Sequence, residues 1–166
     1  MKNISVLLFL LITLALNAQN NKTSGLNARQ FHKYWKVESE SPDYKVTFLG
    51  DTVEILSPKG LTLWRKEKMS GKVTIEYDAC VVVEVEGDRL SDLNCFWMAS
   101  DPQYPDNIWK REKWRSGIFL NCYSLQLYYM GYGGNHNSTT RFRRYDGNEA
   151  AITNAKARPA ILKEYT

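Results

Sequence analysis

The sequence has little that favours a helical, metal-binding or membrane-spanning protein. No segment carries a convincing helical stripe of apolar residues, and residues 149–157 are the only candidate for a short helix. No CxxC motif and no histidine–cysteine spacing predicts a metal site. The apolar run Val6–Leu16 is shorter than the roughly 20 residues that cross a membrane as a helix. We therefore expect no bound cofactor and no membrane insertion, and no internal repeat indicates a repeat architecture.

The N-terminus is typical of an export signal. Lys2 supplies the positive start, Val6–Leu16 is the apolar run, and Ala18 fits the last residue before cleavage. Such a signal directs a bacterial protein to the periplasm or to secretion. The expected organisation is a signal peptide over residues 1–18, a flexible lead-in over residues 19–30 and one folded domain over residues 31–166.

Only three cysteines are present, Cys80, Cys95 and Cys122. An odd number in an oxidising compartment allows at most one internal pair and leaves one thiol over. All three lie inside strand-like runs, which favours three buried free thiols. The sequence itself leaves their disulfide state open.

The net charge of the chain favours an anionic partner, and the expected export decides between the two main classes of such partners. The formal net charge is +4, which is small. A basic balance can indicate nucleic-acid binding, but an exported protein rarely meets nucleic acid, so an acidic polysaccharide is the expected partner. Five tryptophans and ten tyrosines could stack on sugar rings, or they could fill the core of a β-sandwich.

The segment Val73–Glu86 has the clearest structural pattern in the chain. Apolar side chains occupy its odd-numbered positions, and polar side chains dominate its even-numbered ones. Because successive side chains of a strand point to opposite faces, this alternation predicts a long strand with one apolar and one acidic face. The β-branched content argues against a helix. A second sheet would cover the apolar face, and the acidic face, which carries Glu76 and Asp78, is the first candidate for function.

Shorter strand patterns with turn signals between them begin after Phe31. Gly50-Asp51 and Ser57–Gly60 are typical turn sequences, and Ser100–Arg115 reads as a long loop. Many short strands predict an all-β sandwich or barrel. The expected short strands are Tyr44–Leu49, Thr52–Leu56, Leu61–Arg65, Asn94–Ala99, Gly117–Leu120, Leu125–Tyr129 and Thr139–Arg143.

Several runs of residues together resemble a known family. The runs are Gly60–Trp64, Ile75–Asp78, Ser91–Met98, Arg115–Phe119, Tyr128–Asn135 and Thr139–Asp146. In this order they resemble DUF6250, a bacterial family of unknown function found in polysaccharide-degrading Bacteroidetes, over roughly residues 31–165. That family looks related to the YesU-like (DUF1961) proteins associated with rhamnogalacturonan use.

The resemblance implies a concanavalin A-like jelly roll of two antiparallel sheets, one of them curved into a sugar-binding groove. It also implies closing strands beyond Thr166, so we expect a jelly roll that is truncated at the C-terminus. The leading hypothesis is an exported domain that binds a complex, uronate-containing polysaccharide, with cleavage by a lyase or glycoside hydrolase mechanism left open. A non-catalytic carbohydrate-binding module and a structural domain are the alternatives.

Glu76 and Asp78 are candidates for a pair of catalytic carboxylates. Two residues apart on one strand face, their Cα atoms would lie about 7 Å apart, and a retaining glycosidase needs carboxyl groups about 5–5.5 Å apart. Concanavalin A-like glycosidases resemble this arrangement but use Glu-x-Asp-x-(x)-Glu on one strand. Cys80 or Val81 occupies the third place here, so the acid partner is missing. The alternative interpretation is a solvated strand face.

Arg141, Arg143 and Arg144 form a basic cluster after a glycine- and asparagine-rich loop. On a strand, Arg141, Arg143 and Tyr145 would share one face. The planar guanidinium binds a carboxylate through two hydrogen bonds, and a uronate supplies that carboxylate. The alternative is a surface strand that forms salt bridges with the acidic face of Val73–Glu86.

Lyase chemistry is a further hypothesis for the same region. It needs a neutralised uronate carboxylate, a base for the adjacent proton and an acid for the leaving oxygen. Arg143 could neutralise the carboxylate, and His136, Tyr132 or Tyr129 could act as base or acid. His136 lies in a loop where an exposed histidine without a role is the alternative.

Asn94 and Trp97 complete the candidate contacts, because amides bind sugar hydroxyls and indole rings stack on sugars. They could equally be a cap and a core ring. The predicted catalytic residues are Glu76, Asp78, His136 and Arg143, and the predicted substrate-binding residues are Asn94, Trp97, Arg115, Tyr129, Asn135 and Arg141.

Oxygen ligands for Ca²⁺ are present at Asp101, Asp106 and Asn107, but no DxDxD spacing supports a site there. The sequence indicates neither the identity of the sugar nor the oligomeric state.

Overall fold

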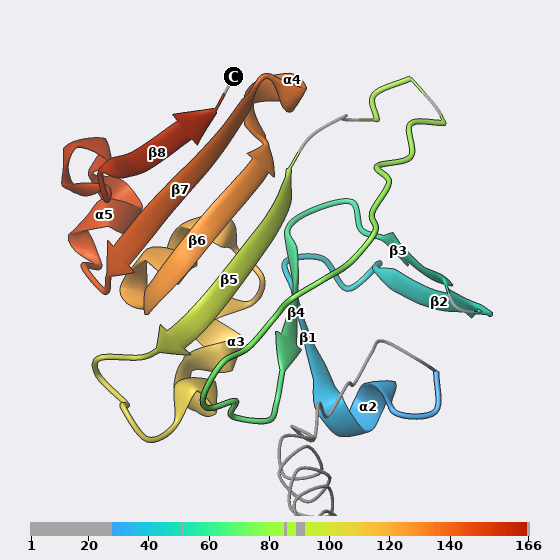
Figure 1. Ribbon diagram of the computed structural model, residues 1–166, viewed down its shortest axis with the longest axis horizontal. Coiled ribbons are helices and arrows are strands. Elements are labelled where there is room, and N and C mark those ends of the chain that lie inside the picture. The colour runs from blue at the N-terminus through green and yellow to red at the C-terminus, as the bar shows by residue number, and fades with distance from the viewer. Residues whose placement is uncertain (1–27, 51, 85, 89–91, 166) are drawn as a thin grey trace, which may run out of the picture.

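The structure is a computed structural model, and it describes residues 28–165 except residues 51, 85 and 89–91 (Figure 1). The signal peptide predicted over residues 1–18 lies outside the described residues, and so does the predicted lead-in apart from a turn at residues 28–30. No helix in the described part of the chain is long and apolar enough to cross a membrane.

An antiparallel sheet of four strands dominates the described chain. Its strands lie in the order β5-β6-β7-β8, and two-stranded antiparallel ribbons are formed by β1 with β4 and by β2 with β3. The strands are β1 (Trp35–Ser39), β2 (Lys45–Leu49), β3 (Thr52–Leu56), β4 (Leu61–Arg65), β5 (Leu93–Ser100), β6 (Gln126–Gly133), β7 (Thr139–Asp146) and β8 (Ile161–Tyr165). The expectation of an all-β protein with antiparallel sheets is confirmed, and the jelly-roll topology stays a prediction.

The helical elements are all short. They are α2 (Phe31–Tyr34), η1 (Ile108–Arg111), α3 (Glu112–Arg115), η2 (Phe119–Ser124), α4 (Gly134–Asn137), α5 (Ala150–Thr153) and η3 (Ala155–Ala157). The helix candidate at residues 149–157 is confirmed as α5 and η3. The expected loop over Ser100–Arg115 carries η1 and α3 instead of being wholly irregular.

Turn chemistry placed most of the predicted strands correctly. Strands β3 and β4 have the predicted bounds, and β2, β5, β6 and β7 overlap their predictions. The turn between β2 and β3 contains Gly50 at φ +62°, a left-handed conformation that glycine adopts without steric cost. Strands β1 and β8 were not predicted from the sequence. All five residues of β8 are exposed, so this strand has no buried face that an apolar pattern could signal.

The strand predicted over Gly117–Leu120 is wrong. Ser116 and Gly117 both have left-handed backbones, with φ +46° and +71°, which end α3 and reverse the chain. Gly117 also lies against β1, where an added Cβ would come within 2.6 Å of the Glu38 carbonyl oxygen. This close approach excludes a side chain, and η2 follows at once.

The long strand predicted over Val73–Glu86 is also wrong for the described residues. Residues 73–84 form no strand, and every residue from 66 to 84 is exposed. Figure 1 shows this segment as a thin green trace without arrows, between β4 and β5 in the order of the chain. The alternation of apolar and polar residues therefore did not suffice to form a strand, because a strand forms only where a neighbouring strand completes its hydrogen-bond ladder.

The hydrophobic core lies against one face of the four-stranded sheet, which we call the inner face. Helices η2 and α5 pack against it, and Trp64 of β4 stacks on it through Phe96, with ring centroids 6.1 Å apart. The opposite, outer face carries half-buried aromatic rings that stack on one another. Inner-face core residues are Phe96, Leu127, Tyr129 and Tyr145, and the outer-face rings are Trp97, Tyr128 and Phe142.

All three cysteines are free, as expected, but they are not all buried. Cys122 lies in the core, Cys95 is half-buried on β5, and Cys80 is exposed. The expectation of burial is wrong for Cys80 because that residue lies on the exposed segment 66–84.

A buried ion pair connects β1 to α3. The Arg115 side chain is 1% exposed and the Glu38 side chain 4%, and Arg115 Nη2 donates to Glu38 Oε1 at 2.6 Å. Arg115 Nε donates to the second carboxylate oxygen at 3.2 Å, and Nη1 donates to the Ile108 carbonyl at 2.8 Å. The guanidinium also lies 5.6 Å from the Trp64 ring centroid. Both charges are thus satisfied within the interior, where losing one partner leaves the other uncompensated.

We expect Glu38→Gln to destabilise the protein by about 3–5 kcal/mol, because it leaves the Arg115 charge buried without a counter-charge. Equilibrium urea unfolding measures the change. Lys59→Met is the matched control, since Lys59 and Glu40 form an exposed pair at 3.8 Å that contributes less than about 1 kcal/mol. Equal effects of the two substitutions would contradict this account of the buried pair.

Candidate functional site

The register of the four-stranded sheet aligns polar residues of the inner face in two adjacent rows. Asn94, Gly131, Arg141 and Glu164 are successive cross-strand partners in the first row. Phe96, Tyr129 and Arg143 are partners in the second row. Because directly opposed residues of paired strands point to the same face, four predicted site residues come together. We call them the inner-face cluster: Asn94, Tyr129, Arg141 and Arg143.

Tyr129 connects the two rows. Its ring leans along β6 over Gly131, where an added Cβ would lie only 2.1 Å from the phenol oxygen. The Tyr129 hydroxyl donates a hydrogen bond to Asn94 Oδ1 at 3.0 Å. Glycine at position 131 therefore makes the space in which this hydroxyl reaches the first row.

The environment of Tyr129 keeps its phenol protonated. The pKa of Tyr129 is raised to about 12, chiefly by burial and also by the negative charge of Asp92, while Arg143 and Arg141 act in the opposite direction. The side chain is 8% exposed. At neutral pH Tyr129 is therefore a hydrogen-bond donor that holds its proton and not a base that is ready to accept one.

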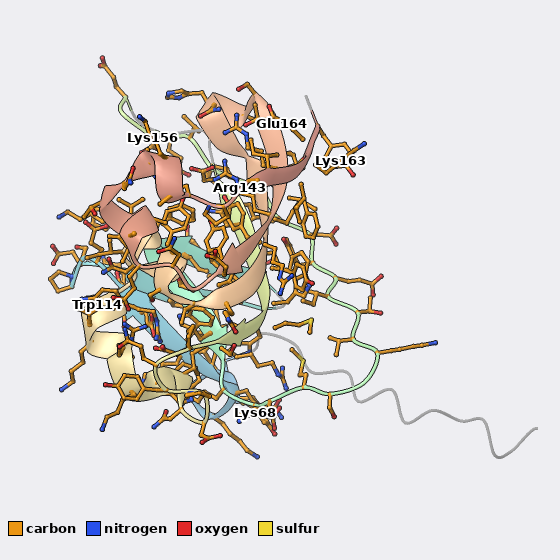
Figure 2. The ribbon with its side chains drawn as sticks, turned by 90° about the vertical axis from the view of Figure 1, so that its left-hand side faces the viewer. Lys68, Trp114, Arg143, Lys156, Lys163 and Glu164 are labelled. Carbon is orange, nitrogen blue, oxygen red and sulfur yellow. The ribbon has the colours of Figure 1, made fainter. Side chains whose placement is uncertain are left out.

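The two arginines of the cluster differ in their partners. Arg141 Nε donates to Glu164 Oε2 of β8 at 2.7 Å. Arg143 is half-buried, and its Nε has no hydrogen-bond partner among the described residues. Figure 2 shows Arg143 on the side of the sheet that faces α5, and Lys163 of the neighbouring strand on the opposite side. An unsatisfied buried donor is costly unless an acceptor is supplied.

The turn between β6 and β7 borders the end of the sheet that carries the first row. Asn135 and His136 lie in this turn, exposed, with φ of +52° and +58°. Asparagine and histidine tolerate such left-handed backbones better than most residues, so α4 is not a regular right-handed helix. Asp92 also lies here, because an added Cβ on Gly134 would be 3.4 Å from its Oδ1. Asn135 and His136 are thus near the cluster by position but not hydrogen-bonded to it.

Trp97 is separated from the cluster. It lies on the outer face, where its ring stacks on Tyr128 and Phe142 with centroids 5.9 and 5.8 Å away. The neighbouring residue Phe96 faces the core, so alternation along β5 sends Trp97 to the other side. The predicted joint contact of Asn94 and Trp97 with one sugar is therefore not supported by their placement.

Glu76 and Asp78 lie apart from the cluster as well. Both are exposed on the irregular segment, and no hydrogen bond or ion pair within the described chain joins them to Arg141 or Arg143. Arg141 pairs with Glu164 instead, so the expected salt bridge between the arginine strand and the acidic face of Val73–Glu86 is not formed. A hollow at this segment is lined only by its own residues 75–78, which do not make a binding cleft.

Arg115 and Asp101 are buried in ion pairs inside the fold. Arg115, predicted to bind substrate, is enclosed with Glu38 and does not reach the surface. Asp101, considered as a Ca²⁺ ligand, is fully buried, and both of its carboxylate oxygens accept hydrogen bonds from Arg111 at 2.8 Å. The loop that carries them looked polar in sequence because these ion pairs lie inside it.

Two further residues of the site, Gly131 and Glu164, were not predicted from the sequence. Gly131 shapes the position of Tyr129, and an isolated glycine inside a strand pattern is a known signal of a close approach. Glu164 holds Arg141, but β8 itself had no recognisable pattern. The first of these could have been found from the sequence, and the second could not.

Comparisons with known proteins identify one family. A family model described as a domain of unknown function (DUF6250) matches residues 55–166, which is more than half of the chain. No curated protein matches the sequence, and no solved structure matches it.

The raised pKa of Tyr129 makes a prediction about stability at alkaline pH. The folded-state pKa, about 12, lies above the ordinary value of 10.0, so stability from the neutral phenol is complete below pH 10 and is lost as the pH rises towards 12. Tyr129→Phe removes the hydrogen bond to Asn94. It also removes the loss of stability at alkaline pH, because phenylalanine has no hydroxyl that could ionise. The stability difference between the original protein and the variant should therefore shrink between about pH 10 and pH 12, as measured by urea unfolding. A constant difference would contradict the burial of an ionisable phenol.

Proposed function

The protein belongs to the DUF6250 family, and we propose that its inner-face cluster binds a uronate-containing polysaccharide. The single observation that carries the proposal is the unsatisfied Nε of Arg143, half-buried beside Arg141 and Tyr129. A carboxylate is the acceptor that best matches a guanidinium with free donors.

The charge of the cluster supports an anionic ligand. Arg141 and Arg143 are two positions apart on β7 and point to the same face, whereas the described acid nearest to them in the register, Glu164, occupies only Arg141. One guanidinium is therefore left to take a bidentate carboxylate. Phosphate would also fit a guanidinium, but a uronate carboxylate suits the neutral hydrogen-bonding groups beside it.

Those neutral groups are the side chains of Tyr129 and Asn94. Their mutual hydrogen bond leaves the Asn94 amide donors and the second lone pairs of both oxygens for a ligand. Sugar hydroxyls both donate and accept, so a pair of this kind can bind them next to the charged carboxyl group. Asn135 on the β6–β7 turn offers a further amide at the same end of the sheet.

We further infer that the protein is exported to the periplasm or secreted, and that its complete fold is a concanavalin A-like jelly roll related to the YesU-like proteins. The N-terminal pattern of Lys2, Val6–Leu16 and Ala18 supports export. The described antiparallel sheet, with a polar and aromatic inner face, supports the fold. An exported protein meets the polysaccharides of its surroundings directly.

Cleavage of the bound polysaccharide is the second candidate function. A lyase needs a base, and Tyr129 holds its proton at neutral pH, so the phenol suits the role of acid or positioning donor. His136 is the remaining nitrogen base at this end of the sheet, exposed on the turn. A glycoside hydrolase needs two carboxylates across the sugar, and the inner-face cluster contains none. Binding therefore takes precedence over cleavage.

We expect Arg143→Ala to weaken binding of polygalacturonate by about tenfold to a hundredfold, because a hydrogen bond to a charged group contributes about 1.5–3 kcal/mol. Isothermal titration calorimetry or affinity electrophoresis measures the change. Arg144→Ala is the matched control, since this neighbouring arginine is exposed and alternates to the outer face. It removes the same charge and should leave the affinity within about twofold.

The same polymer with its carboxyl groups reduced to alcohols serves as the control ligand. If the cluster recognises uronate, the reduced polymer binds weakly and does not distinguish Arg143→Ala from the original protein. Equal binding of both polymers, or equal losses in the two arginine variants, would contradict the proposal. Appearance of unsaturated uronate ends during incubation would establish the lyase function, and a His136→Ala variant would then test the base.

A further inference from the structure

A pocket in the N-terminal part of the described chain has no role in the proposed function. It has a volume of about 350 Å³ and is lined by residues of α2, β1 and β2 and by Lys66. Figure 1 shows that the β2–β3 ribbon projects away from the β1–β4 ribbon, with α2 below both. We call this hollow the ribbon pocket. Small-molecule sites have volumes of about 300–1,000 Å³, so the ribbon pocket is large enough for a small ligand.

Apolar side chains make up most of the pocket lining because two strands contribute one face each. Trp35 and Val37 are two positions apart on β1, and Val46 and Phe48 are two positions apart on β2. Residues with this spacing share one face of a strand. Phe31 of α2 packs edge-on against Phe48, with ring centroids 5.3 Å apart. The two strands and the helix thus bring an apolar, largely aromatic surface together.

The aromatic walls of the ribbon pocket are held in place by contacts within the protein. Phe31 is 3% exposed, and its contact with Phe48 restricts both rings. The Trp35 ring centroid lies 5.8 Å from the guanidinium of Arg65, a cation–π contact that restricts the indole. Tyr44 is 37% exposed, so the lining extends from a buried ring to an exposed one. Walls that are already ordered reduce the conformational entropy that is lost when a ligand binds.

The charged groups in the lining of the ribbon pocket are all basic. They are Lys36, Lys66 and the exposed His32, and the described residues of the lining include no aspartate or glutamate. The ammonium group of Lys36 forms an ion pair with Glu112, which lies outside the lining. Because this pair compensates the charge of Lys36, the positive charge of the pocket comes from Lys66.

The ammonium group of Lys66 is available to an anionic ligand. Its Nζ donates a hydrogen bond to the backbone carbonyl of His32, which holds the amine beside the pocket. The neighbouring carboxylate of Glu67 pairs with Arg65 instead, and Lys66 has no ion pair within the described chain. An ammonium group has three donors, so two of them remain for a carboxylate.

We propose that the ribbon pocket binds a small aromatic carboxylate. The ring of the ligand packs against Phe31, Trp35 and Phe48, and its carboxylate accepts hydrogen bonds from Lys66 Nζ. Burial of the apolar ring supplies the affinity, and the single uncompensated cation fixes the orientation. This site shares no residue with the inner-face cluster, and it does not rest on the proposed function.

The composition of the lining favours an aromatic ring over a sugar ring. A uronate carries hydroxyl groups on most of its ring carbons, and a hydroxyl that is buried without a partner costs free energy. Side chains without hydrogen-bonding atoms make up much of the lining, and Trp35 Nε1 is buried. An aromatic carboxylate has one polar end and an apolar body, which matches one free ammonium group beside an apolar surface. The apolar side chains without hydrogen-bonding atoms are Phe31, Val37, Val46 and Phe48.

Isothermal titration calorimetry of the full chain with 2-naphthoate tests the proposal. We expect 2-naphthoate to bind about fivefold more tightly than 2-naphthamide, a neutral molecule of nearly the same shape, because only the carboxylate pairs with Lys66. Galacturonate has the charge without the aromatic ring. It should bind at least about tenfold more weakly than 2-naphthoate, because its hydroxyl groups would lose their water against apolar side chains.

Two pairs of variants locate the binding. Lys66→Met keeps an apolar stem and should weaken 2-naphthoate binding by about fivefold. Lys68→Met is its matched control, since Lys68 is exposed and lies outside the lining. Tyr44→Ala removes a ring from the lining and should weaken binding by about threefold to tenfold. Its control is Tyr104→Ala, because Tyr104 is equally exposed, at 38%, and lies outside the lining.

Several results would overturn the proposal. They are equal affinities for 2-naphthoate and 2-naphthamide, equal losses in a variant and its control, and no binding of 2-naphthoate at concentrations on the order of 10 mM. Tighter binding of galacturonate would overturn it too, because the pocket would then be a sugar site. An affinity for 2-naphthoate that falls as the protein concentration rises would mean that a second copy of the chain occupies the pocket instead.

The ribbon pocket and the inner-face cluster are tested independently. Arg143→Ala should leave the affinity for 2-naphthoate within about twofold, and Lys66→Met should leave the affinity for polygalacturonate within about twofold, since distant sites act additively. If 2-naphthoate binds through Lys66 and polygalacturonate does not bind, the proposed function is wrong and the ribbon pocket stands. If polygalacturonate binds through Arg143 and 2-naphthoate does not bind, the ribbon-pocket proposal is wrong and the proposed function stands.

Discussion

The alternation of side chains across the β5–β8 sheet is the constraint on which the candidate site depends. Because neighbouring residues of a strand point to opposite faces, Arg143 lies on the inner face and Arg144 on the outer face, although they are adjacent in the sequence. The register then decides which residues of different strands meet, and it brings Asn94 and Arg141 into one row across the bare backbone of Gly131. The polar cluster is therefore a product of pairing and not of proximity in the sequence.

Two arginines show how the surroundings assign a role. Arg115 is enclosed with Glu38, a backbone carbonyl and an indole ring, so its charge is compensated within the fold. Arg143 lies on a strand whose neighbours supply no acceptor for Nε. The same side chain thus connects β1 to α3 in one place and keeps a donor without a hydrogen-bond partner in the other. A sequence cannot distinguish these cases, because the partner of Arg115 lies far away in the chain.

Local signals in the sequence predicted the parts of the fold that depend on neighbouring residues. Turn chemistry located β2, β3 and β4, and the alternation of side chains along a strand predicted that Arg141 and Arg143 share a face with Tyr145. Features that depend on distant partners were missed or misplaced. Gly117 turns because β1 approaches it, and the segment around Tyr77 remains irregular although its pattern is the most regular in the chain. Long-range packing overrides local preference in both places.

The exposed valines of the segment before β5 have a consequence for the behaviour of the protein at high concentration. Val81, Val82 and Val83 are 40%, 64% and 52% exposed, and a short β-branched run without proline is the kind of sequence that stacks into cross-β fibrils. The acidic residue Glu84 follows this run directly and acts as a gatekeeper through charge repulsion between stacked copies. Replacing this glutamate by a neutral residue would remove the charge and favour fibril formation.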